Sequence, residues 1–126
     1  MLSLAGAVVS AEDPTKLFEF YRKLFGDPLW EGPTFKVYPA GKGAIAIGPD
    51  DRLHGEPKEP MRVMFNLETD DLEGEFERVK GLGAKVVAEP APPSDDPGIR
   101  MATFADPDGN YFQVHTPTPE MLQSQG

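Results

Sequence analysis

The feature that most constrains this chain is an internal repeat, in which one helix pattern recurs 58 residues further along the sequence. Asp13 and Asp71 are separated by this offset, and each precedes apolar residues at three- and four-residue steps. Phe18 and Phe76 keep the same offset inside the two patterns. Coincidence between two amphipathic helices is the alternative explanation. The matching order of elements around both helices favours a fold built from two copies of one unit.

Each half of the sequence predicts a strand, a helix and three further strands. Asp caps the start of each predicted helix and Gly ends it. In the first half we expect a strand over 3–10, a helix from 13 to 26, and strands over 29–30, 35–38 and 43–48. In the second half we expect a strand over 61–68, a helix from 70 to 83, and strands over 85–88, 99–105 and 111–116, with a Pro-rich loop over 89–98.

These elements predict an α+β fold of two βαβββ modules, about 1–48 and 61–116, within a single domain over residues 1–126. Residues 49–60 contain three prolines and almost no apolar side chains, which is typical of a linker. The polar tail over 117–126 is expected to be frayed. A chain of this length should bury its remaining apolar surface in a homodimer.

Charge and composition narrow the classes of partner. The net charge is −9, so the average field repels nucleic acid. The simplest explanation of this acidity is solubility, and a site for cationic ligands is the alternative.

No apolar run approaches the ~20 residues that span a bilayer. Met1–Ser10 carries no basic residue of the kind that begins a secretory signal, so we expect a cytoplasmic protein. The absence of cysteine excludes disulfides and thiolate metal sites.

Three segments resemble the vicinal oxygen chelate superfamily, which includes glyoxalases, bleomycin resistance proteins and extradiol dioxygenases. They are SAEDPTKLFEFYRKLFG over 10–26, DLEGEFERVKGLGAKVV over 71–87 and TFADPDGNYFQV over 103–114. The resemblance extends from about residue 4 to 116. It implies two βαβββ modules whose paired, curved mixed sheets form a cleft, with the helices outside and usually a dimer.

The resemblance also implies four strand positions that hold a divalent metal, usually through His, Glu or Gln. Two of these positions fall on Gly6 and Met64, seven residues before Asp13 and Asp71. Gly has no side chain, and the Met thioether is a soft ligand for such a metal. The third position lies on the strand over 43–48, which has no donor side chain, and the fourth is Gln113. We therefore expect no metal and no other cofactor.

Strand alternation nominates a lining for the implied cleft. Asn66, Gln113 and His115 supply its polar groups. His115 alone is more simply explained as a hydrogen-bonded structural residue, and Trp30 and Phe35 taken singly are more simply explained as core. The candidate ligand-binding residues are Val8, Trp30, Phe35, Met64, Asn66, Tyr111, Gln113 and His115.

Three classes of function follow from these residues. The first is a protein that binds a small organic molecule without a metal, as the bleomycin resistance branch does. The second is an enzyme of the lyase or dioxygenase type, either with a displaced metal or with metal-free chemistry. The third is a subunit that uses the fold as a scaffold. The missing ligands at Gly6 and Met64 favour the first class, and nothing in the sequence identifies the ligand or a catalytic residue.

Overall fold

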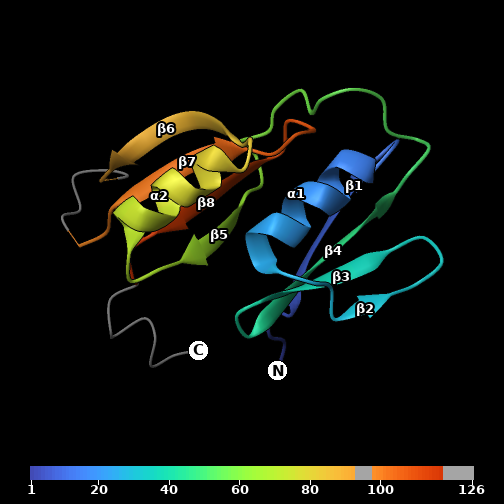
Figure 1. The fold of residues 1–126 in the computed structure, drawn as a ribbon, viewed down its shortest axis with the longest axis horizontal. Coiled ribbons are helices and arrows are strands. Elements are labelled where there is room, and N and C mark those ends of the chain that lie inside the picture. Colours follow the sequence, from blue (N-terminus) through green and yellow to red (C-terminus); the bar gives the residue numbers. More distant parts are fainter. Residues whose placement is uncertain (93–97, 118–126) are drawn as a thin grey trace. The chain divides into compact units, whose positions relative to one another are not determined.

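The computed structural model describes residues 1–92 and 98–117, and the chain divides into two compact units, Met1–Lys58 and Glu59–Gly126. Each unit consists of a four-stranded mixed sheet with one helix against one of its faces (Figure 1). The predicted α+β class is thereby confirmed. Neither described helix is long and apolar enough to cross a membrane.

In the first unit the strand order is β1-β4-β3-β2. The edge strand β1 runs parallel to β4, and the other two pairs are antiparallel. Its elements are β1 (Gly6–Ala11), α1 (Thr15–Phe25), β2 (Trp30–Glu31), β3 (Lys36–Ala40) and β4 (Gly43–Pro49).

The second unit repeats this topology, with the strand order β5-β8-β7-β6 and a parallel pair between β5 and β8. Its elements are β5 (Phe65–Glu68), α2 (Leu72–Gly81), β6 (Lys85–Ala91), β7 (Met101–Ala105) and β8 (Tyr111–His115). The order of elements predicted from the 58-residue offset is confirmed in both units.

Helix α1 buries its apolar stripe against one face of the first sheet. The buried residues of the stripe are Leu17, Phe20, Tyr21 and Leu24. The hydroxyl of Tyr38, on β3, donates a hydrogen bond to the main-chain carbonyl of Phe18 at 3.2 Å. Tyr38 is only 1% exposed, so this bond links the helix to the sheet inside the core of the unit.

The second unit has an aromatic core on the α2 face of its sheet. The Phe104 ring lies 5.6 Å from that of Phe76, on α2, and 5.6 Å from that of Phe112. Phe65 stacks on Phe112 at 5.3 Å. Because side chains alternate along a strand, the neighbours of these residues in β5, β7 and β8 point to the opposite face.

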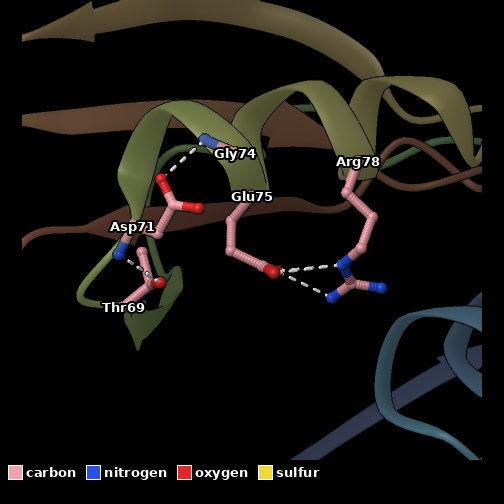
Figure 2. A network of polar contacts seen from close by, with 5 residues as sticks. All are labelled: Thr69, Asp71, Gly74, Glu75 and Arg78. Atoms are coloured by element: carbon pink, nitrogen blue, oxygen red, sulfur yellow. Dashed lines mark hydrogen bonds and ion pairs between the residues drawn. The ribbon is translucent and has the colours of Figure 1, made fainter.

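The start of α2 shows how local sequence determines a helix end. The Asp71 carboxylate accepts a hydrogen bond from the Gly74 amide at 3.0 Å, and the Asp71 amide donates to the Thr69 hydroxyl (Figure 2). Further along, Arg78 pairs with Glu75 at 2.7 Å. The predicted Asp cap of α2 is confirmed. In α1, Asp13 instead accepts from the Thr15 amide and hydroxyl, and Pro14 precedes the first helical residue.

Several predicted strand boundaries differ from the observed ones, because a strand ends where its partner ends. The strand expected over 61–68 is paired only from Phe65, which lies opposite Phe112 near the start of β8. The strand expected over 3–10 begins at Gly6, opposite Ala44 in β4. Conversely, β6 continues to Ala91, into the loop expected over 89–98. Pro90 is tolerated in this strand because β6 lies at the edge of the sheet, where a backbone N–H that points outward has no partner strand to bond. Residues 93–97 and 118–126 lie outside the described residues.

Candidate functional site

Each sheet has one face that its own helix does not cover, and we call this its open face. Cross-strand neighbours point to the same face, so the pairing register shows which residues share it. In the first unit Val8 pairs with Ala46, Ala46 with Val37, and Val37 with Trp30. These four residues form an apolar row across all four strands, in which Val8 is 69% and Trp30 56% exposed.

Phe35 lies on the same open face, beside the apolar row. A Cβ added at Gly48 would overlap the Phe35 ring, so the ring lies directly on the glycine. Ser10 pairs with Gly48 and gives this face a polar side chain among the residues of the paired strands. Val8, Trp30 and Phe35 therefore share one apolar surface of the first unit.

The open face of the second unit is polar at the equivalent place. Asn66 on β5 pairs with Gln113 on β8, and Gln113 pairs with Thr103 on β7. The Gln113 Nε2 donates a hydrogen bond to the Thr103 hydroxyl oxygen at 3.1 Å. We call Asn66, Gln113 and Thr103 the polar row. It contains two carboxamides and one hydroxyl, and no charged group.

Thr103 is a site residue that the sequence interpretation missed. The signal was present: the strands predicted over 99–105 and 111–116 leave a turn over 106–110 between them. Counting outward from its centre at Asp108 places Thr103 opposite Gln113. The side chain is only 9% exposed, so its hydroxyl is held in a fixed position beside the carboxamide.

His115 lies in the next row of the same face, between Glu68 and Met101. Its Nδ1 is 2.6 Å from the Thr116 carbonyl oxygen. A carbonyl only accepts hydrogen bonds, so Nδ1 carries a proton, and Nε2 is the ring atom that can accept one. His115 is 7% exposed and has a hydrogen-bonded structural role through Nδ1.

The remaining two candidates lie at the start of these strands. Tyr111 pairs with Ala105 and shares the open face of Gln113 by alternation. Met64 lies just before β5 rather than within it, and its side chain is half-buried. The eight candidates thus divide between units, with Val8, Trp30 and Phe35 in the first and the other five in the second.

The residues at the implied metal positions do not fit a divalent metal. A Cβ at Gly6 would overlap the main-chain carbonyl oxygen of Ala44, so the backbone has no room for a ligand side chain there. In β4, the ring of Phe35 occupies the space over Gly48. Gln113 already bonds Thr103. Within residues 1–92 and 98–117, no three His, Asp or Glu side chains come together as a metal site would require.

The strongest electrostatic perturbation lies in the segment after β4. Hydrogen bonds from Arg52 lower the pKa of Asp50 to about 2. The two partners form an exposed ion pair at 2.7 Å. Asp50 and Arg52 belong to neither row, so this pair organises the chain after β4 rather than the candidate site.

Comparison with known proteins agrees with this geometry. A family model described as a glyoxalase-like domain matches residues 6–115, which is most of the chain. FosX, a fosfomycin resistance protein from Listeria monocytogenes, is similar in structure with a TM-score of 0.73 and 20% identity, over 95% of this chain and 97% of that one. FosX from Mesorhizobium loti is similar with a TM-score of 0.71 and 20% identity, over 100% of this chain and 99% of that one.

A glyoxalase/bleomycin resistance protein/dioxygenase family enzyme from Burkholderia phytofirmans gives a TM-score of 0.70 at 16% identity, over 89% of this chain and 96% of that one. At these identities the structural similarity concerns the fold. The family match and the shared fold together support the vicinal oxygen chelate superfamily that the sequence resembles. The chain belongs to the glyoxalase-like domain family.

Proposed function

We propose that this chain binds a small organic molecule on the open faces of its sheets without a metal, and that it does so as a cytoplasmic homodimer. The observation that carries the proposal is the polar row, a set of neutral hydrogen-bonding groups at the strand position where the resemblance implies a metal ligand. The proposed contact residues are Val8, Trp30, Phe35, Met64, Asn66, Tyr111, Gln113 and His115.

Small-molecule sites combine apolar surface with a few oriented polar groups. On the first sheet, the apolar row offers a surface that removes water from a ligand, and Trp30 adds an exposed aromatic face for stacking. On the second sheet, the polar row offers a ligand hydrogen-bonding groups of defined geometry. Two of the similar structures are fosfomycin resistance proteins, and this likeness supports a role in which the chain binds a small molecule.

One observation favours a second candidate, a metal-free enzyme. His115 donates through Nδ1 to the Thr116 carbonyl and leaves Nε2 as an acceptor on the open face, which is the tautomer that a general base requires. A His115→Gln variant tests this role. Loss of turnover with unchanged ligand affinity would support the enzyme, whereas equal losses would leave only the binding role.

The binding proposal is tested by a thermal-shift screen of small aromatic and cationic compounds, followed by titration of the hits. We expect Gln113→Leu to keep the fold, because the side-chain volumes are similar, with a small fall in the melting temperature of the free protein from the lost bond to Thr103. It should weaken binding by about 1–3 kcal/mol, the cost of leaving a polar ligand group unpaired. Unchanged affinity in this variant would show that Gln113 does not contact the ligand.

The proposed homodimer has support in the apolar residues that precede the two edge strands β1 and β5. Leu2 and Leu4 are 99% and 94% exposed, and Met61 and Val63 are 58% and 84% exposed. Apolar side chains beside an unpaired strand edge favour association with another chain. Sedimentation should show a dimer at micromolar concentration, and Met61→Ser with Val63→Ser should shift it toward monomer. A monomer in the wild-type protein would contradict the proposal.

A further inference from the structure

Arg100 and Thr116 lie opposite each other just beyond the paired residues of β7 and β8, and the Thr116 hydroxyl there takes the place of its own carbonyl. We propose that Thr116 is a positioning residue for His115. Its hydroxyl occupies the Arg100 amide, and this leaves the Thr116 carbonyl to hold a proton on Nδ1 of the imidazole. This proposal rests on the proposed function, since it specifies what His115 offers to a ligand on the open face.

The hydrogen bonds between Arg100 and Thr116 depart from a regular ladder. In an antiparallel sheet, the two residues of a hydrogen-bonded pair exchange both of their N–H···O=C bonds. The Thr116 amide donates to the Arg100 carbonyl at 3.0 Å, as the ladder requires. The Arg100 amide donates instead to the Thr116 hydroxyl oxygen, also at 3.0 Å. Among the described residues the reverse main-chain bond is not formed, so the regular strands stop one pair earlier, at Met101 and His115.

The Thr116 carbonyl, which this substitution releases, bonds the imidazole. Its oxygen lies 2.6 Å from Nδ1 of His115. An amide only donates and a carbonyl only accepts, so the hydroxyl oxygen accepts from Arg100 and Nδ1 carries a proton. A Thr side chain that bonds the main chain in this way competes with the sheet ladder. The carbonyl is therefore available to His115 because the hydroxyl satisfies the Arg100 amide.

The main chain around this contact is held on both sides. On the β5 side, the Thr69 amide donates to the His115 carbonyl at 2.9 Å. On the β7 side, the Thr116 hydroxyl also approaches the Arg100 carbonyl at 3.5 Å, so both its accepting and its donating role are directed to Arg100. The His115 side chain is 7% exposed, which leaves the ring little room to turn. The bonding of the Thr116 carbonyl thus depends on which group satisfies Arg100.

The position of the proton decides what His115 can recognise. In a neutral imidazole, a proton on Nδ1 leaves Nε2 as the acceptor. Nε2 is the ring nitrogen farther from the main chain, and the side chain lies on the open face. With the Thr116 hydroxyl in place, a neutral His115 therefore offers an acceptor to a ligand group that donates a hydrogen bond. Without the hydroxyl, the ring can present an N–H there instead.

The experiment follows the imidazole nitrogens by NMR in the full-length chain without ligand, at pH 9, where the ordinary imidazole pKa leaves the ring neutral. The chain contains two histidines, and a His54→Gln variant assigns their signals. The wild-type protein should show mainly the tautomer of His115 with the proton on Nδ1. Thr116→Val keeps the shape of the side chain without its hydroxyl. It should change the tautomer ratio about fivefold or more toward Nε2–H, the equivalent of one net hydrogen bond.

Two controls separate this role from a general structural one. Thr116→Ser retains the hydroxyl and should keep the wild-type tautomer ratio. Glu73→Gln removes the ion pair that Glu73 forms with the Arg100 guanidinium and leaves the Arg100 amide in place. It should also keep the wild-type ratio, because the amide and not the guanidinium bonds Thr116.

If Thr116→Val and a second variant without the hydroxyl, Thr116→Ala, both keep the wild-type ratio, Thr116 does not position His115. Loss of the wild-type ratio in Thr116→Ser would overturn the proposal as well. So would a scalar coupling in the wild-type protein between the Arg100 nitrogen and the Thr116 carbonyl carbon, since it would show that the regular main-chain bond is made. The proposed function fails separately, when hits from the thermal-shift screen bind Gln113→Leu as tightly as the wild-type protein.

Discussion

Gly6 lies against the main-chain carbonyl oxygen of Ala44, its partner in the parallel pair of β1 and β4, so closely that a Cβ at Gly6 would overlap that oxygen. The glycine at an implied metal-ligand position is thus a steric requirement of this strand pair as well as a missing donor. Replacing it has consequences for stability that do not depend on any ligand.

Gly6→Ala should lower the free energy of unfolding by roughly 1–3 kcal/mol, because a backbone atom has to shift to admit the methyl group. Chemical denaturation measures this loss. Gly43→Ala is the matched control on the facing strand. Its added Cβ would lie 3.1 Å from the Ala5 carbonyl oxygen, so the loss should be smaller. Equal stability of Gly6→Ala and the wild-type chain would show that β1 does not hold this close approach.

The purified protein should carry no stoichiometric divalent metal, because Gly6, Met64 and the β4 strand provide no hard donor. Elemental analysis should find far less than one Zn, Ni, Fe or Mn per chain. A chelator should leave the melting temperature unchanged, since only a ligand that binds the folded state raises it. About one metal per chain, with a fall in melting temperature on chelation, would contradict this expectation.

Gly74→Ala should fail to give the stabilisation that Gly→Ala normally gives inside a helix. The usual gain is about 0.5–1 kcal/mol, but here the new Cβ would overlap the Asp71 carboxylate that caps α2. Loss of the cap costs about 1 kcal/mol, so the two effects nearly cancel.

A double-mutant cycle isolates this coupling between residues 71 and 74. In an Asp71→Ala background, which has no cap to lose, Gly74→Ala should recover most of its gain. Gly81→Ala is the control in the same helix, because nothing lies within 4 Å of its added Cβ. Identical effects of Gly74→Ala in both backgrounds would contradict the predicted contact.

Stability should fall at alkaline pH in a way that depends on Tyr38. Burial raises the pKa of Tyr38 above its usual value of 10.0. The folded chain therefore holds the phenol proton more tightly than the unfolded chain. The associated stability is complete below pH 10 and is lost as pH rises through the folded-state pKa. Denaturation at pH 8 and above pH 10 measures this loss.

The matched variant is Tyr38→Phe, which removes the titrating group together with the bond to the Phe18 carbonyl. It should be less stable at pH 8 by about 1 kcal/mol, the net value of one hydrogen bond. It should also lose less stability than the wild-type chain between the two pH values. Parallel pH curves for the two proteins would show that Tyr38 is not the responsible group.

The sequence predicted most of the elements and which side chains share a sheet face. Helices were predictable because their apolar spacing and their caps, such as Asp71, are local. The absence of metal donors at Gly6 and Met64 was equally readable from single positions. The alternation that assigns Asn66, Gln113 and Val8 to open faces agrees with the observed register.

By itself, therefore, the sequence determined the duplicated βαβββ units, the Asp71 cap of α2 and the missing ligand side chains, because each follows from residue type and near-neighbour spacing. Only the tertiary structure decided where β5 begins, that Phe35 lies on Gly48, and that Thr103 holds Gln113. These features depend on which strands pair and in which register. A single-residue shift of register moves every side chain of a strand to the other face, so a site on a sheet face is settled only when the strands are paired.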